Sequence, residues 1–176
     1  GIDNIELFRR SYQVNVLSLV NFLEAVRCLS PMSRLFYAAS SHIFKGTPSD
    51  MQDENTPVNP TCVYGITKAS GLFSCRFYRN TYAVFASTGI LYNHESSIRS
   101  DKFVSQKIIK GAVNIKNGRQ EKLKLGDINA DEDWGYAPNY VEAMHNILNI
   151  GAPDDFVIAT GQKHSVREFV RTAFNY

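Results

Sequence analysis

Hydrophobic positions in this chain recur at helical spacing in some segments and form short unbroken runs in others. Residues 5–28 carry apolar side chains three or four positions apart, which predicts a helix with one wide buried face. Residues 64–82 read as a second long helix. Residues 34–39 and 84–92 are mostly apolar runs of the length expected for buried strands. The first half of the chain therefore alternates helix and strand.

This alternation is typical of a doubly wound parallel sheet. The pattern changes after residue 93. The elements predicted there are a helix near 101–117, a short strand at 123–125, a loop that holds Trp134, a helix at 138–150, a strand at 156–159 and a last helix that begins after Ser165 with a capping box to Glu168. We therefore predict an α/β chain: the C-terminal part of a doubly wound, Rossmann-like parallel-sheet domain, followed by a smaller α/β part.

Composition and charge narrow the class of protein. Of the 176 residues, 44% are hydrophobic and 12% aromatic, which excludes a disordered chain. The formal net charge is only +2, so we expect neither a nucleic-acid partner nor binding to a membrane surface. No apolar run approaches the roughly 20 residues of a membrane-spanning helix, and we expect no secretory signal. Three cysteines without CxxC spacing indicate reduced thiols in a cytoplasmic protein, and we expect no metal site.

The two ends of the chain lack the usual boundary signals. The sequence opens at Gly1 without a methionine, runs directly into helical pattern and stops at Tyr176 without a helix stop signal. We expect it to be an interior piece of something longer.

The second predicted helix begins with a tyrosine and a lysine four positions apart. Tyr64 and Lys68 project from one helix face, one turn apart. A lysine ammonium close to a phenol favours the phenolate, and such a base can take a hydroxyl proton while a hydride leaves the same carbon. Any amphipathic helix can hold this spacing, so the pair alone also fits a surface tyrosine beside a surface lysine.

A pair of serines follows the first predicted strand. Ser40, Ser41 and His42 come where open α/β sheets place their ligands. A serine there can bridge a substrate hydroxyl and the tyrosine, although paired serines after a strand also serve as a loop or cap. The long loop that follows is of a kind that is usually functional. A strand ending in two serines, a long loop and Tyr-x-x-x-Lys opening a helix form the Ser/Tyr/Lys arrangement of short-chain dehydrogenases/reductases.

Further sequence blocks extend this likeness over nearly the whole chain. They are Arg34 to Tyr37, Tyr64 to Lys68, Gly89 to Ser96, Phe103 to Ile108, Leu125 to Asp127, Asp133 to Gly135, Tyr140 to Val141, Asp155 to Gly161 and Ser165 to Arg167. With these blocks the chain resembles the extended short-chain dehydrogenases/reductases that act on nucleotide sugars, and among them the GDP-mannose 4,6-dehydratases.

The resemblance implies an enzyme that binds NADP, with NAD as the alternative, in a Rossmann-like part (residues 1–92 here) and a GDP-linked sugar in residues 93–176. It implies that a hydride leaves C4 of the sugar with Tyr64 as base, Lys68 tuning that base and reaching the nicotinamide ribose, and Ser41 holding the hydroxyl. Water then leaves across C5 and C6, and the hydride returns to C6.

The same resemblance assigns binding residues beyond the first part. Asn93, His94 and Glu95 should border nicotinamide and sugar, with His94 among the cofactor-binding residues, Lys107 should face the pyrophosphate and Gly126 should lie near the guanine. Without the resemblance, Lys107 reads as a solvated charge, His94 as a loop cap and Glu95 as an ion-pair partner.

The resemblance also implies a homodimer or homotetramer. The helices at 5–28 and 64–82 would pair with a second subunit through their broad apolar faces. Burial of those faces in the core of one chain explains the pattern equally well.

Three departures qualify the resemblance. The glycine-rich phosphate loop is absent from these residues, so we expect this chain alone to bind the dinucleotide poorly. The glutamate expected two positions after the catalytic serine is Ile43, and a one-residue slip would bring His42 into that slot as the base for C5. An arginine expected before Asp133 is Glu132, which should weaken nucleotide binding.

Two alternatives to a dehydratase therefore remain. One is a GDP-sugar C4 dehydrogenase, epimerase or reductase that oxidises C4 without losing water. The other is a non-catalytic protein of the same fold that binds nucleotide sugars.

Overall fold

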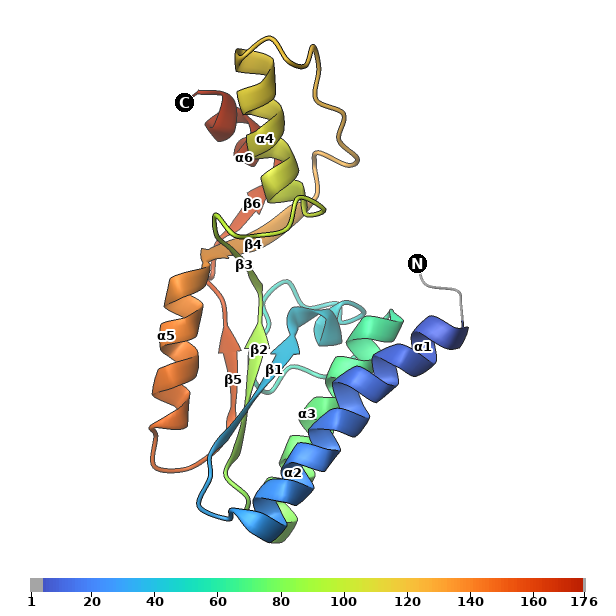
Figure 1. Ribbon diagram of the computed structural model, residues 1–176, viewed down its shortest axis with the longest axis vertical. Coiled ribbons are helices and arrows are strands. Elements are labelled where there is room, and N and C mark those ends of the chain that lie inside the picture. Colours follow the sequence, from blue (N-terminus) through green and yellow to red (C-terminus); the bar gives the residue numbers. More distant parts are fainter. Residues whose placement is uncertain (1–4, 176) are drawn as a thin grey trace. The chain divides into compact units, whose positions relative to one another are not determined.

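The computed structural model of the protein describes residues 5–175 and divides into two compact units (Figure 1). The first unit contains the residues up to 92 together with 141–158, and the second contains 93–140 and the residues from 159 on. The sequence pattern predicts a division after residue 92, with all of residues 93–176 in the second part. Residues 141–158 return to the first unit because they carry a strand of its sheet. The binding functions assigned to the two parts stay predictions.

The first unit is built on a parallel three-stranded sheet of Rossmann type. Its strands are β1 (Leu35–Ser40), β2 (Ala86–Leu91) and β5 (Asp155–Ile158), in the order β1-β2-β5. Every residue of β2 is buried, because this strand is paired on both edges and covered on both faces. The predicted α/β class with a parallel sheet is confirmed.

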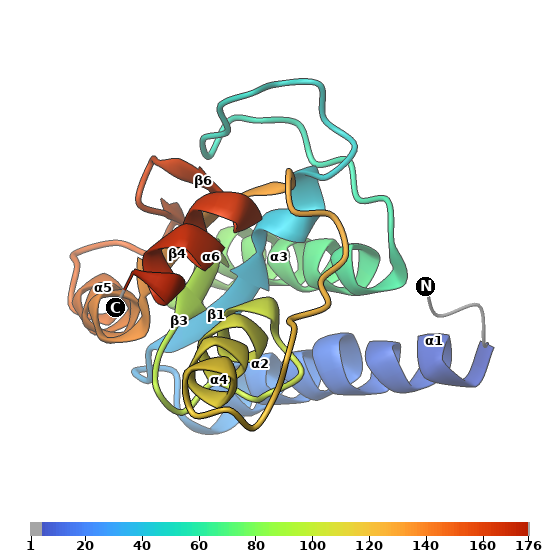
Figure 2. The ribbon, with the colours of Figure 1, turned by 90° about the horizontal axis from the view of Figure 1, so that it is seen from above.

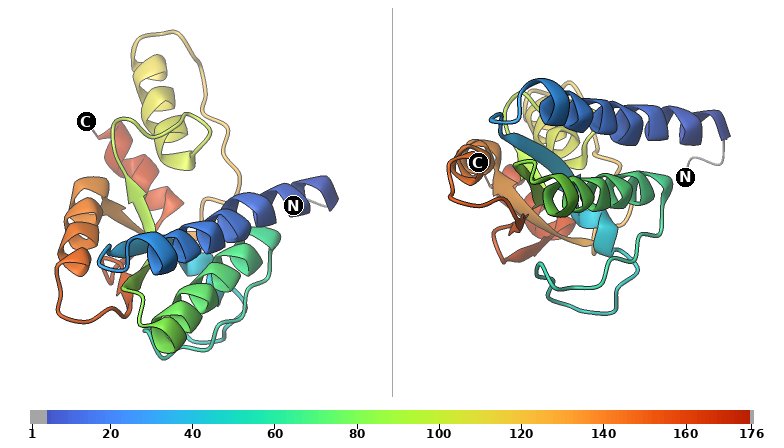
Figure 3. Two further views of the ribbon diagram at one scale, coloured as in Figure 1. Left: turned by 60° about the horizontal axis from the view of Figure 1, so that its bottom comes forward. Right: turned by 90° about the horizontal axis from the view of Figure 1, so that it is seen from below.

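Helices cover both faces of this sheet. One face carries a long helix made of α1 (Ile5–Tyr12), the π-helical turn η1 (Gln13–Leu17) and α2 (Ser18–Leu29), together with α3 (Val63–Tyr82). The other face is covered by α5 (Ala137–Leu148), as Figure 1 shows. Figure 3 shows the long N-terminal helix running beside α3. Leu23, Leu72 and Cys75 meet Ile90 of β2 in the core between these helices and the sheet.

The wide buried face predicted for residues 5–28 is confirmed for α2 and wrong for α1. Leu19 and Leu23 of α2 are buried, whereas α1 has no buried residue and Ile5 is 67% exposed. The reason is that α1 packs beside the start of α3, where no strand lies beneath it.

A buried charged cluster joins α3 to the start of β5. Asp155 is buried, and its carboxylate accepts hydrogen bonds from Arg76 Nε at 2.5 Å and Arg79 Nη2 at 3.2 Å. The neighbouring Asp154 also lies 3.5 Å from Arg79 Nη2, but its side chain is 73% exposed. The pairing compensates the cost of burying the carboxylate of Asp155.

The second unit pairs short strands beneath two helices. Its elements are β3 (Asn93–Glu95), α4 (Val104–Lys116), β4 (Asp131–Tyr136), β6 (Lys163–Ser165) and α6 (Val166–Phe174). β4 runs parallel to β3 and antiparallel to β6. The capping box predicted at Ser165 and Glu168 is confirmed.

Two predictions in this unit are wrong. Residues 123–125 form no strand, and Leu123 instead packs against Gly111 of α4. Trp134 lies in β4 rather than in a loop. The acidic run of β4 resembles a loop, but buried Asp133 accepts hydrogen bonds from the backbone N–H groups of Thr160 and Gly161.

The long loop predicted after β1 is ordered by hydrogen bonds at its base. After the short 3₁₀ helix η2 (Ser41–Phe44) it makes a wide excursion (Figure 2). Asn59 N–H donates to Ile43 O at 2.7 Å, and Gly46 N–H donates to Asn59 O at 2.8 Å. These bonds bring the returning chain back beside η2, immediately before α3 begins.

Candidate active site

Ser40 and Ser41 take different places at the C-terminal end of β1. Ser40 caps η2, because its Oγ accepts the backbone N–H of His42 at 3.4 Å. Ser41 is the first residue of η2 and is half-buried. Ser41 is therefore the member of the pair that does not serve as this cap, and its catalytic role stays a prediction.

The first turn of α3 lies directly against η2. Cys62 caps α3, with its Sγ accepting the N–H of Gly65 at 3.4 Å. A Cβ on Gly65 would stand 2.7 Å from the carbonyl oxygen of His42 and 3.0 Å from Pro60 Cβ. Only glycine allows this approach of helix to backbone. The contact brings Tyr64 next to His42.

Tyr64 and His42 meet edge to face. Their ring centroids are 5.5 Å apart and the planes make an angle of 83°. The Tyr64 side chain keeps 44% of its surface exposed. The Nδ1 atom of His42 also lies 3.7 Å from Sγ of Cys62. A phenol and an imidazole, both able to transfer protons, therefore share one partly open site.

Lys68 lies on the same helix face as Tyr64, as predicted. Its Nζ donates to the carbonyl oxygen of Ala38 in β1 at 2.8 Å and stands 5.6 Å from the Tyr64 ring centroid and 5.2 Å from that of Tyr37. Burial lowers the pKa of Lys68, and burial also raises that of Tyr37. The ammonium is thus fixed by the sheet between two aromatic rings. The catalytic roles of Tyr64 and Lys68 stay predictions.

A buried hydroxyl supports the first turn of α3 from within the helix layer. Thr67 Oγ1 donates to the carbonyl oxygen of Tyr64 at 2.9 Å and accepts from Asn15 Nδ2 at 3.0 Å. Asn15 belongs to the π-helical turn η1. This contact could not be predicted from the sequence, because Asn15 and Thr67 are far apart in the chain.

Ile43, which stands in the slot of the expected glutamate, has no access to a ligand. Its side chain is 0% exposed and belongs to the core of the first unit. The ring of His42 instead contacts Tyr64. Of these two neighbours, only His42 belongs to the site.

In the second unit, Asn93 and Glu95 are engaged by neighbouring side chains. Asn93 Nδ2 donates to Glu132 Oε2 at 2.9 Å, so the residue in the expected arginine position holds β3 to β4. Glu95 Oε2 accepts from Ser105 Oγ at 2.7 Å and lies 3.4 Å from Arg99 Nε. These contacts match the structural interpretation of Glu95, and its role with a substrate stays a prediction.

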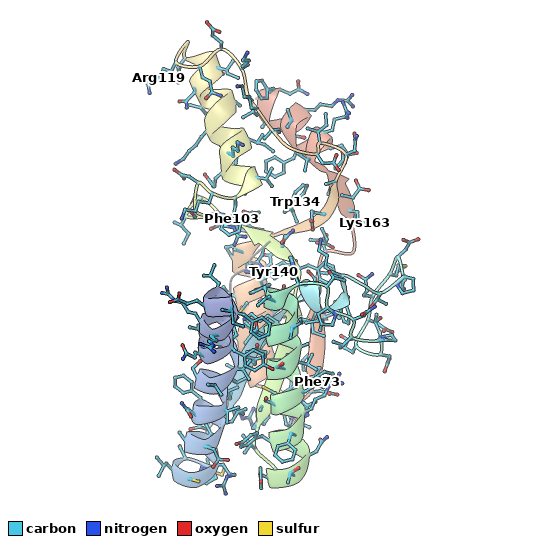
Figure 4. All side chains as sticks on the ribbon, turned by 90° about the vertical axis from the view of Figure 1, so that its right-hand side faces the viewer. Phe73, Phe103, Arg119, Trp134, Tyr140 and Lys163 are labelled. Carbon is cyan, nitrogen blue, oxygen red and sulfur yellow. The ribbon has the colours of Figure 1, made fainter. Side chains whose placement is uncertain are left out.

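His94 stacks on a buried tyrosine of the same unit. The centroids of His94 and Tyr140 are 4.7 Å apart with an interplanar angle of 24°. Burial raises the pKa of Tyr140 to about 12. Figure 4 labels Tyr140 together with Trp134 and Phe103 of the same unit. His94 is thereby oriented by an aromatic platform, and its cofactor role stays a prediction.

A groove of about 730 Å³ runs along the second unit and includes Gly126. Most of its lining is apolar, with Leu125 and Ile128 among it, while Arg167 and Arg171 of α6 supply cationic groups and Glu121 supplies one carboxylate. Arg167 belongs to one of the sequence blocks that carry the resemblance, but no role is predicted for it. Arg171 could not be predicted, because an arginine on an amphipathic helix carries no local signal.

Lys107 does not join this groove. It lies exposed on α4, as its interpretation as a solvated charge expects. Its role toward a pyrophosphate stays a prediction.

Within residues 5–175, no helix is long and apolar enough to cross a membrane. The same residues hold no group of three or more histidine, cysteine or acidic side chains placed to bind a metal ion.

Known proteins resemble this chain in sequence along nearly its full length. The family model described as GDP-mannose 4,6 dehydratase matches residues 5–176. GDP-mannose 4,6 dehydratase 2 of Caenorhabditis elegans is 42% identical over 161 residues, which are 92% of this chain and 42% of the relative. GDP-mannose 4,6 dehydratase of Homo sapiens is 38% identical over 173 residues, 97% of this chain and 46% of the relative. The chain spans less than half the length of these relatives.

Solved structures of similar fold are more distant in sequence. The dTDP-glucose 4,6-dehydratase of Bacillus anthracis, in complex with NAD, has a TM-score of 0.82 at 22% identity, over 93% of this chain and 52% of that one. RMD of Pseudomonas aeruginosa, complexed with NADPH, has a TM-score of 0.83 at 22% identity, over 94% of this chain and 58% of that one. These likenesses establish the fold. Because the family match extends from residue 5 to residue 176, the chain belongs to the GDP-mannose 4,6-dehydratase family.

Proposed function

We propose that this chain carries the catalytic residues of an NADP-dependent GDP-sugar 4,6-dehydratase, which converts GDP-mannose or a related GDP-hexose or heptose to its 4-keto-6-deoxy form. The observation that carries the proposal is the ammonium of Lys68, fixed at 2.8 Å on Ala38 O of β1 beside the ring of the half-exposed Tyr64. Membership of the family supports the choice of GDP as the nucleotide.

The first chemical task of the site is to oxidise a sugar alcohol. Tyr64 takes the C4 hydroxyl proton, the ammonium of Lys68 stabilises the resulting phenolate, and Ser41 holds the hydroxyl oxygen. When bound, the nicotinamide would accept the C4 hydride and later return it to C6. Fold relatives bound to NAD and NADPH support a nicotinamide cofactor, and NADP rather than NAD is our proposal.

The second task is to remove the proton on C5. With Ile43 buried in the core, His42 is the neighbouring side chain that contacts Tyr64, and Lys68, the other basic group beside that ring, is held by Ala38 O. The carbonyl at C4 makes the C5 proton acidic, and a neutral imidazole is a base suited to neutral pH. We assign this step to His42.

The groove of the second unit is our candidate site for the nucleotide. Its apolar walls suit a purine base, and Arg167 and Arg171 suit phosphates. A Cβ on Gly126 would find no atom within 4 Å, so packing does not require glycine there and a ligand can approach the backbone closely. Gly126→Val should raise KM for the GDP-sugar about tenfold with unchanged Tm. An unchanged KM would remove Gly126 from the site.

The remaining binding residues are proposals of the same kind. Asn93, His94 and Glu95 would border the nicotinamide and the sugar, and Lys107 would meet the pyrophosphate. Their present contacts in β3 and on α4 hold the side chains in defined places.

The test of the proposed function is the mass of the product that the enzyme carrying this chain forms from GDP-mannose. Loss of one water is the expected result. Tyr64→Phe should lower kcat by about 10²-fold or more, because it removes the base. Tyr82→Phe is the matched control, since Tyr82 lies at the other end of α3 with the same exposed fraction of 44%. Equal activity in both variants would point to a non-catalytic binding protein.

The buried Ile43 favours a second candidate, a GDP-sugar C4 dehydrogenase, epimerase or reductase. Without a base for C5, oxidation at C4 would not lead to loss of water. A product of unchanged mass, or reduced cofactor that accumulates during the reaction, would select this alternative.

We also propose that the enzyme is a homodimer or homotetramer. Phe22 of α2 is 66% exposed, and Phe73 and Phe77 of α3 are 50% and 53% exposed. Large exposed apolar side chains on two adjacent helices are typical of a subunit interface. Phe73→Glu should shift the mass measured by light scattering toward the monomer. An unchanged mass would place the interface elsewhere.

Two further proposals concern the setting of the activity. We infer that the protein resides in a reducing compartment, the cytoplasm. This is supported by its three cysteines, none of which forms a disulfide within residues 5–175. We also infer that the 176-residue chain alone is inactive, since its sequence holds no glycine-rich loop to bind the cofactor's phosphates.

A further inference from the structure

The thiol of Cys62 makes two contacts at the start of α3. Its Sγ accepts the N–H of Gly65 at 3.4 Å and lies 3.7 Å from Nδ1 of His42. The sulfur is half-buried in the angle between η2 and α3. Cys62 therefore contacts the side chain to which we assign the C5 proton, and it was not among the residues singled out from the sequence.

The direction of the contact between Cys62 and His42 decides which imidazole nitrogen carries a lone pair. If the thiol donates to Nδ1, the proton of the neutral ring is on Nε2, which then cannot accept another. If Nδ1–H donates to the sulfur, Nε2 is the basic nitrogen. The sulfur already acts as an acceptor, because it caps the N-terminus of a 20-residue helix. The positive end of that helix favours electron density on the sulfur. Both facts favour Nδ1–H as the donor.

We propose that Cys62 is a positioning residue for the dehydration step: its sulfur holds Nδ1–H of His42, so that Nε2 accepts the proton from C5. The inference rests on the proposed function. The C5–H bond breaks, the proton passes to Nε2, and the electron pair forms the enolate of the C4 ketone. The enolate pair then forms the C5–C6 double bond as the C6–O bond breaks. The imidazolium protonates the departing hydroxyl, which leaves as water, and His42 is neutral again.

The proposal separates Cys62 from the oxidation at C4. Lys68 is fixed by Ala38 O, and the Tyr64 backbone is held by Thr67. Neither contact involves the sulfur of Cys62. Removal of the sulfur should therefore affect the loss of the C5 proton and spare the transfer of the C4 hydride.

The first measurement is the ¹⁵N NMR spectrum of the histidine side chains of the enzyme. In the unaltered enzyme, we expect the signals of His42 to show a proton on Nδ1 and a lone pair on Nε2. In Cys62→Ala we expect the opposite tautomer, which free imidazole side chains prefer. Cys62→Ser keeps an acceptor and should restore the Nδ1–H form. A proton on Nε2 in the unaltered enzyme would overturn the proposal.

The second measurement compares the two chemical steps in the same variants. Cys62→Ala should slow exchange of the C5 proton with deuterated solvent, and the loss of water, by about tenfold, while single-turnover oxidation at C4 stays within about twofold. Cys62→Ser should recover most of the loss. Cys28→Ala is the matched control, since it removes an exposed thiol from the end of α2 and should change neither step.

The outcomes separate the two levels of the argument. Absence of C4 oxidation in the unaltered enzyme would refute the proposed function. Normal oxidation and dehydration in the unaltered enzyme, with equal dehydration in Cys62→Ala, would overturn the role of Cys62 alone. The melting temperature of each variant identifies any loss of stability caused by the missing helix cap. If Cys62→Ala still slowed dehydration in a His42→Gln background, a role of Cys62 through His42 would also be contradicted.

Discussion

Gly65→Ala tests whether the contact between α3 and η2 determines the site. The new Cβ would stand 2.7 Å from the His42 carbonyl oxygen and 3.0 Å from Pro60 Cβ. Ordinary contacts between such atoms are about 3.5 Å, so the backbone of His42 must move by roughly 0.5–1 Å. Both neighbours are relatively rigid, since one is backbone and the other a proline ring.

Two opposing energies set the magnitude of the effect. Overpacking costs about 1–3 kcal/mol, whereas alanine in place of glycine within a helix contributes up to about 1 kcal/mol of stability. Because Gly65 lies in the first turn of α3, where propensity counts least, we expect the clash to win. The free energy of unfolding should fall by about 1 kcal/mol. The displacement of His42 should lower the rate of dehydration by about 10-fold to 100-fold.

The assay combines urea unfolding with the rate of loss of water from GDP-mannose. Gly151→Ala is the control, because a Cβ there meets no atom within 4 Å and the residue lies outside the helices. Its effect on unfolding should stay within about 0.5 kcal/mol. If Gly65→Ala were as stable as the unaltered protein and dehydrated at the same rate, the contact would not hold His42 in place.

Two further predictions concern charged groups of the first unit. Asp155→Asn should lower the free energy of unfolding by about 3 kcal/mol, because it leaves two arginines without their buried partner. Asp154→Asn is the control: this side chain is exposed, so the free energy of unfolding should change by no more than about 0.5 kcal/mol. Equal effects of the two substitutions in urea unfolding would contradict this account. Hydrogen bonds from Arg27, and secondly from Tyr78, lower the pKa of Glu24 from 4.5 to about 2. The ionised Glu24 therefore stabilises the fold fully above about pH 4.5, and this stabilisation is lost as the pH falls toward 2. Glu24→Gln should flatten this part of the curve of urea midpoint against pH, and an unchanged slope would show that the pairing is weak in solution.

Much of the fold could be predicted because it rests on strong local patterns. The strands β1 and β2 are apolar runs, and α3 shows clear helical periodicity. The strand β4 escaped prediction because its acidic residues are stabilised by partners distant in sequence, as with Asp133 and the backbone of residues 160 and 161. Leu123 and Leu125 suggested a strand because they are apolar, but Leu123 packs against Gly111 of α4 and both residues line the groove of the second unit.

The candidate site could be predicted only where its geometry is local. Tyr64 and Lys68 share a face because helical spacing requires it. The contact of Cys62 with His42 could not be predicted, because the long loop between them returns through backbone bonds at Asn59 that no motif encodes. The roles of Arg167 and Arg171 depend on a groove formed by segments from several parts of the second unit.

The π-helical turn at 13–17 changes the direction in which the side chains before it project from the long N-terminal helix. Such a turn contains one residue more than an α-helical turn, so everything before it is rotated by about 100° relative to a regular helix. Deleting one residue within the turn would therefore swing Ile5 and Leu7 by more than a quarter of a circle, while Leu19 and Leu23 kept their places under the sheet. The exposed segment α1 can therefore be rotated without moving the buried residues of α2. A change of one residue in the turn would alter the surface that α1 presents and leave the core intact.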